Sequence, residues 1–107
     1  MAMTRKDILD AANKCVNGDR DEQYGNPENN FKMIANLWME YLENCGSVPN
    51  GTEVFLRPED VASMMALMKI ARIATGGPKE DSWIDLAGYA ACGGEIVSAK
   101  IKDVENL

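Results

Sequence analysis

Two basic and two acidic side chains lie on neighbouring segments of this sequence, at spacings that suit either chemistry or packing. Lys69 and Arg72 are three residues apart within an otherwise apolar stretch. Asp81 and Asp85 follow it and are four residues apart. Side chains three or four residues apart share one face of a helix. The aspartates could therefore bind a divalent ion while the cations contact phosphate groups. Alternatively, each cation pairs with one aspartate, and the pairs only fix how two helices pack.

A helical hairpin should position these four residues. The apolar stretch and the stretch that opens with Asp81 both have helical patterns, and TGGPKE (75–80) between them breaks any helix. With a rise of ~1.5 Å per residue, Lys69 lies about 9 Å from the turn and Asp85 about 6 Å from it. Arg72 and Asp81 both lie within about 5 Å of the turn. The charges should therefore meet as two pairs at matching heights along the hairpin.

Three further acids are candidate metal ligands. Glu40 and Glu43 form an ExxE pair whose carboxylates project from the same side of a helix, and the alternative is a solvated charged face. Asp60 could join them, or could only be a favourable charge near the positive end of its helix. The chain has no histidine, and its three cysteines form no CxxC. A metal site here would consist of carboxylates and favour a hard ion such as Mg²⁺ or Mn²⁺.

The sequence predicts an all-α fold, a bundle of about four helices in a single domain over residues 1–107. Thr4 and Asp7 make a capping box at the start of the first helix. Asn26, followed by a proline, starts the second helix, and Asp81 is a natural N-cap for the fourth. The third helix is apolar on nearly every side, so it should be central and touch partners on several faces.

For three segments the sequence allows more than one kind of packing. Residues 54–56 should lie on the core or on a neighbouring subunit. Glycines 93 and 94 indicate either the close approach of another helix or a break in the fourth helix. Residues 98–107 are charged, and we expect them to fray or to pack on a partner chain.

The overall composition excludes several classes of protein. A formal charge of −6 argues against a dedicated nucleic-acid binder, which needs a cationic surface. No apolar run approaches the ~20 residues of a membrane span, and the first residues lack the apolar core of a secretory signal. Without histidine, Ser-His and Cys-His nucleophilic catalysis is excluded. We therefore expect a cytoplasmic protein that contacts neither nucleic acid nor membrane.

Four stretches of the sequence together resemble a known family. These are GDRxxxYGNPEnnF (18–31), LWxxYL (37–42), DVAxMMxLxKIAR (60–72) and DSWIDLAGYA (81–90). They resemble a family of small uncharacterised bacterial and phage proteins. That family in turn looks like a branch of the all-α nucleoside triphosphate pyrophosphohydrolases, the group of MazG and the dimeric dUTPases. The resemblance implies an oligomer, a homodimer or a homotetramer.

The resemblance also implies a site. Those enzymes hold Mg²⁺ with carboxylates of an ExxE and an ExxD motif, and they cleave a nucleotide between its α and β phosphates. Asp85, with Asp81 one turn before it, matches the position of the second motif, although DxxxD departs from its spacing. Glu40-x-x-Glu43 has the form of the first motif, whereas Asp60 lies in a more closely matching stretch. The residues implied for nucleotide contacts are Arg20, Tyr24 and Gly25 of the matching loop, joined by Tyr89, which lies one turn after Asp85.

Two functions follow as expectations. The first is a Mg²⁺-dependent pyrophosphohydrolase, or a nucleotide binder derived from one, acting on a (deoxy)nucleoside triphosphate. Its metal ligands would be Asp81 and Asp85 with Asp60 or an acid of the ExxE pair, and Lys69 and Arg72 would stabilise charge on the leaving pyrophosphate. The second is a non-enzymatic helical module, for example a phage protein that binds a host partner, with an exposed apolar patch at residues 54–56.

Overall fold

The computed structural model of the protein describes residues 1–19 and 26–107. Over these residues the chain is all-helical and has no strand, as predicted. The elements in chain order are α1 (Arg5–Lys14), the π-helical turn η1 (Cys15–Asp19), α3 (Pro27–Asn44), α4 (Pro58–Thr75) and α5 (Glu80–Glu105).

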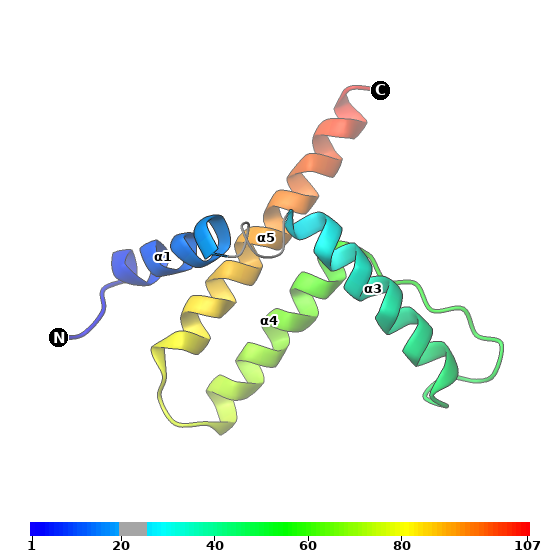
Figure 1. Cartoon of the computed structure of the whole chain (residues 1–107), viewed down its shortest axis with the longest axis horizontal. Coiled ribbons are helices and arrows are strands. Elements are labelled where there is room, and N and C mark those ends of the chain that lie inside the picture. The colour runs from blue at the N-terminus through cyan, green and yellow to red at the C-terminus, as the bar shows by residue number, and fades with distance from the viewer. Residues whose placement is uncertain (20–25) are drawn as a thin grey trace.

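An antiparallel hairpin of α4 and α5 forms the centre of the molecule (Figure 1). The first half of α3 crosses the hairpin near the start of α4, and its second half extends away from it. α1 packs on α5 and makes no contact with α4. The last turns of α5 project beyond the other helices (Figure 1). The hairpin that was expected to position the candidate residues is therefore present.

Short-range hydrogen bonds define the helix starts. The backbone N–H of Asp7 donates to Thr4 Oγ1 at 3.1 Å, and the N–H of Thr4 donates to an Asp7 carboxylate oxygen at 2.9 Å. The N–H of Glu28 donates to Asn26 Oδ1 at 2.8 Å. Both caps were predicted. The predicted cap of the last helix is wrong, because α5 begins at Glu80 and Asp81 lies inside its first turn.

The core is small and lies where α3 crosses the hairpin. Its buried side chains are Phe31, Ala35, Val61, Ala62, Cys92 and Ile96. A Cβ added to Gly93 would lie 3.0 Å from the Ala62 Cβ, and one added to Gly88 would lie 3.1 Å from Val16 Cγ1. Glycine thus allows α4 and η1 to approach α5 closely. Because α5 continues through this region, glycines 93 and 94 do not mark a break, and of these two only Gly93 marks a close contact, since a Cβ added to Gly94 would meet nothing within 4 Å.

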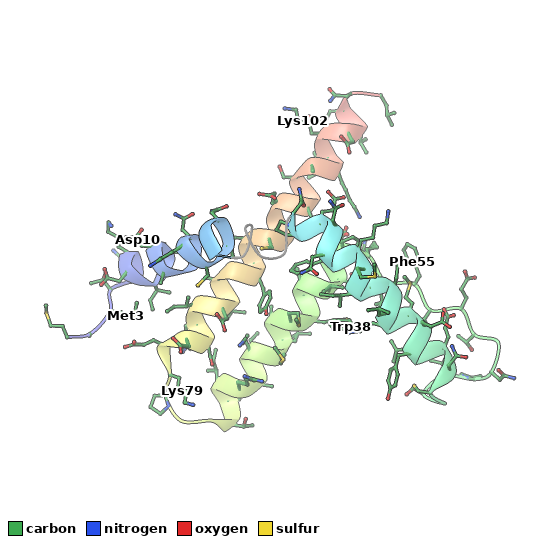
Figure 2. The ribbon with its side chains drawn as sticks, viewed as in Figure 1. Met3, Asp10, Trp38, Phe55, Lys79 and Lys102 are labelled. Atoms are coloured by element: carbon green, nitrogen blue, oxygen red, sulfur yellow. The ribbon has the colours of Figure 1, made fainter. Side chains whose placement is uncertain are left out.

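Two other expectations each offered alternatives. Of residues 54–56, the outer two are partly buried and Leu56 packs against the core, whereas Phe55 is 78% exposed and lies beside α3 (Figure 2). Packing of Phe55 on a neighbouring subunit stays a prediction. The last stretch does not fray, because α5 continues up to Glu105, and its packing on a partner chain stays a prediction. No helix in the described part of the chain has the length and apolar character needed to cross a membrane.

Candidate functional site

One candidate pair joins the two helices of the hairpin near its turn. Lys69 Nζ on α4 lies 2.8 Å from Asp85 Oδ2 on α5. The Lys69 side chain is 12% exposed, whereas that of Asp85 is 41% exposed. The predicted meeting of these two groups is confirmed, because the helical rise brings them to matching heights. The half-exposed Asp85 carboxylate therefore contacts both the largely buried Lys69 ammonium group and solvent.

The second expected pair does not form. Arg72, in the last turn of α4, and Asp81, in the first turn of α5, are both exposed and make no ion pair with each other or with any other described residue. Asp81 lines a depression of about 460 Å³ with the connection that contains Lys79 and with Trp83. Figure 2 shows Lys79 in this connection, at the far end of the hairpin from Lys102. Arg72 and Asp81 thus remain available to a ligand.

A cluster of four charges lies at the other end of the hairpin. Lys100 Nζ on α5 donates to both carboxylate oxygens of Glu59 on α4, at 2.7 and 2.8 Å. The Arg57 guanidinium donates to both oxygens of Asp60, at 2.9 and 3.0 Å. The Arg57 backbone N–H also donates to Asp60, at 2.8 Å. Every charge in this cluster has a partner.

These contacts shift the acids toward the ionised form. Hydrogen bonds from the side chain and backbone of Arg57 lower the pKa of Asp60 to about 2. The hydrogen bond from Lys100 lowers the pKa of Glu59, against the effect of its partial burial. Stable ion pairs at a helix start account for both shifts. For Asp60 the structure therefore favours the helix-start interpretation over metal binding.

Sequence reasoning missed Glu59 and Lys100. They are 41 residues apart, and no local pattern relates them. The signal for Arg57 was present, since a basic residue three positions before an acid can form a pair across one helical turn.

Tyr89 lies near this cluster of four charges. It packs against the core and, together with Asp60, lines a groove of about 500 Å³ between α4 and α5. It does not line the depression beside Asp81.

The ExxE pair of α3 has other contacts. Glu43 Oε2 accepts a hydrogen bond from the backbone N–H of Val54 at 3.0 Å and so holds the following loop against α3. Glu40 Oε1 lies 3.4 Å from the side-chain amide of Asn44. Within residues 1–19 and 26–107, no group of three or more acids and cysteines is arranged to hold a metal ion. Metal binding by any of the five predicted acids stays a prediction.

The predicted nucleotide contacts of the loop cannot be placed. Arg20, Tyr24 and Gly25 lie outside the described residues. The site that the structure describes therefore consists of the pair Lys69–Asp85 and the two exposed charges beside it.

Sequence comparisons place this all-helical hairpin protein in a family. Residues 7–97 match the model of a domain of unknown function, DUF6378, and the chain belongs to that family. It is 42% identical over 85 residues to the Gene 55 protein of Mycobacterium phage D29, covering 79% of this chain and 50% of the relative. It is also 42% identical over 83 residues to the Gene 55 protein of Mycobacterium phage L5, covering 78% of this chain and 47% of the relative. No solved structure matches.

These matches confirm the expected resemblance to a small phage family. The chain spans about half the length of these two relatives. The further resemblance to the pyrophosphohydrolases stays a prediction.

Proposed function

We propose that this protein is a divalent-metal-dependent nucleoside triphosphate pyrophosphohydrolase of the MazG-like all-α type, or a nucleotide binder derived from one. It acts as a homodimer or homotetramer in the cytoplasm of a bacterium or of a phage host. One observation carries the proposal. A largely buried lysine meets a half-exposed aspartate across the hairpin, and an arginine one turn further along α4 has no anion among the described residues.

The charges at this end suit a phosphate chain. Lys69 and Arg72 are three residues apart on α4, so one phosphate group can lie within reach of both. Arg72 offers several N–H donors in one plane, which matches the geometry of phosphate oxygens. Lys69 is held by Asp85 at 2.8 Å and so needs no reorganisation to meet a ligand. The two cations would stabilise the charge that develops on the leaving pyrophosphate.

A divalent ion fits the acids that remain. Glu43 and Asp60 have hydrogen-bond partners within the chain. Among the described residues, Asp81 has no such partner and Asp85 has one carboxylate oxygen without an ion-pair partner. These two aspartates are one turn apart on α5. Mg²⁺ is commonly bound by one or two carboxylates together with waters and substrate phosphates. Asp81 and Asp85 would therefore hold the ion jointly with the nucleotide. When bound, the ion would neutralise phosphate charge and lower the pKa of a coordinated water.

Pyrophosphate release tests this proposal directly. We would assay a panel of canonical and modified nucleoside triphosphates with Mg²⁺ or Mn²⁺. The variant Asp85→Asn should lower release by about 100-fold or more while helical content is retained. Asp10→Asn is the matched control, because Asp10 also pairs with a lysine, Lys6, but both side chains are exposed on α1, outside the hairpin. Release that survives in Asp85→Asn, or silence across the panel in a folded protein, would contradict the catalytic role.

A second candidate function is a non-enzymatic helical module that binds a protein partner. The observation in its favour is the 78% exposed ring of Phe55, within the segment where an apolar patch was expected. Thermal stability separates the two functions. A nucleotide-binding protein gains stability from millimolar Mg²⁺ with nucleotide by mass action, and a module without such a site does not.

A further inference from the structure

The outward side of α4 is apolar and, within residues 1–19 and 26–107, packs against no other helix. Its exposed large side chains are those of Met64, Leu67, Met68 and Ile70, joined by the small side chains of Ala71 and Ala74. Each of these residues has another member of the set three or four positions away, as in the series 64, 67, 71 and 74, so the set lies along one side of the helix. We call this set the outer face of α4. The opposite side carries the buried Val61 and Ala62, which pack toward α3 and α5.

The outer face lacks the charges that a solvated helix face carries. Between Asp60 and Arg72 the only ionisable side chain of α4 is Lys69, and that side chain is turned to Asp85. Surface helices of soluble proteins alternate apolar and charged faces, and a helix that is apolar all round is buried. The third helix was expected to touch partners on several faces. Within the described part of the chain, it has such partners on only one side.

The whole molecule also exposes more surface than a finished fold of its size. Its radius of gyration is 16.1 Å, against about 13 Å for a compact chain of this length. Its accessible surface is 7824 Å², roughly 1,900 Å² above the value for a compact monomer of this mass. A stable dimer buries about 800 Å² per partner, and obligate homodimers bury considerably more. The excess accessible surface is therefore comparable with the area that each copy buries in an obligate homodimer.

We propose that the outer face of α4 is where a second copy of this chain docks, with the two α4 helices side by side across a two-fold axis near Leu67. A two-fold contact uses the same patch on both copies, and a two-fold axis perpendicular to the helices makes the two α4 helices antiparallel. The macrodipoles of the two helices are also opposed, which is favourable. This gives a contact surface to the homo-oligomer of the proposed function, and it holds or fails independently of hydrolysis.

Light scattering and sedimentation of the full chain test the inference. The wild-type protein should have the mass of two chains or a multiple of it. Leu67→Glu, at a 63% exposed position, should raise the dissociation constant by about 1,000-fold, because the charge enters the centre of the contact twice. Leu9→Glu is the matched control, since Leu9 is 61% exposed on α1, which makes no contact with α4. It should leave the mass unchanged.

These measurements test the assembly of two copies separately from the proposed activity. A monomeric wild-type protein overturns the inference, and so does a Leu67→Glu protein that stays associated or a Leu9→Glu protein that dissociates. If Leu67→Glu loses helical content, hydrogen exchange of the wild-type protein decides. The amides of α4 should exchange faster on dilution, and unchanged exchange refutes the contact. A dimer that releases no pyrophosphate leaves this inference standing and removes only the proposed catalysis.

Discussion

The two ends of the α4–α5 hairpin use the same kinds of side chain in different ways. At the open end, Arg57 and Lys100 each have a carboxylate partner at 2.7 to 3.0 Å. At the turn end, Lys69 has a partner but Arg72 has none among the described residues. The first end is electrostatically complete within one chain. The second still has an exposed cation and an exposed acid.

The presence or absence of a partner within the chain distinguishes structural from functional charged side chains better than their residue type does. A pair such as Glu59–Lys100, in which one side chain is largely buried and the other is half-exposed, holds two helices in register and adds little net stability. Arg72 in the last turn of α4 and Asp81 in the first turn of α5 interact favourably with their helix dipoles but have no ion-pair partner among the described residues, so both remain free to bind a ligand. The comparison predicts that changes at the turn end affect ligands, whereas changes at the open end affect stability.

The largest expected effect is on turnover, from removal of the Lys69 charge. Lys69→Met keeps the volume of the side chain and leaves Asp85 partly in water, so the free energy of unfolding should change by no more than about 1 kcal/mol. Pyrophosphate release should fall by about 100-fold because a cation at the phosphates is lost. Lys100→Met, at the open end, should leave release within about twofold of the wild type. Equal turnover in both variants would make the two ends alike, with both pairs structural.

An intermediate effect is expected from the two arginines. Arg72→Met should weaken nucleotide affinity by about tenfold, since a charge-assisted hydrogen bond to phosphate is lost. It should leave the melting temperature unchanged, because Arg72 has no ion-pair partner in the described chain. Arg57→Met should do the reverse and lower the melting temperature by a few degrees without changing affinity. Calorimetric titration with a non-hydrolysable nucleotide and thermal unfolding measure the two quantities. A loss of affinity in Arg57→Met would place the ligand at the open end.

The smallest expected effect is on acid stability. The pKa of Asp60 is lowered from 3.8 to about 2, so its contribution to stability is fully present above about pH 4 and is lost as pH falls toward 2. After allowance for solvent screening, that contribution is about 1 kcal/mol. Denaturant unfolding between pH 5 and 2 should therefore show a flatter profile for Asp60→Asn than for the wild type. In an Arg57→Met background the same substitution should not alter the slope, and a slope that still changes would mean that Arg57 is not the cause of the shift.

Sequence reasoning succeeded where an interaction spans one helical turn or one tight connection. Thr4 with Asp7 and Asn26 with Glu28 lie two or three residues apart, so their backbone geometry follows directly once a helix forms. The Lys69–Asp85 pair was also predictable, although it joins two helices, because the hairpin connection is short and the helical rise is constant. Matching heights were enough to bring those groups together.

The same reasoning failed where rotation about the helix axis or crossing geometry decides. Arg72 and Asp81 have matching heights but do not meet. Asp81 was expected to cap a helix, but the helix begins at Glu80 and its N-cap is Lys79, two residues before Asp81. No local pattern predicted that Glu43 accepts a hydrogen bond from Val54, eleven residues away in a loop. Height along a hairpin limits which residues can meet, but it does not determine which side chains turn toward each other.

The sequence by itself determined that this protein is all-helical, where most of its helices begin and end, and that a lysine and an aspartate meet across one hairpin. These features depend on hydrogen bonds and spacings within a few residues. Only the tertiary structure decided that Glu59 and Lys100 pair across 41 residues and that the outer face of α4 is left uncovered. Those features depend on how α3, α4 and α5 cross, which many distant side chains determine together.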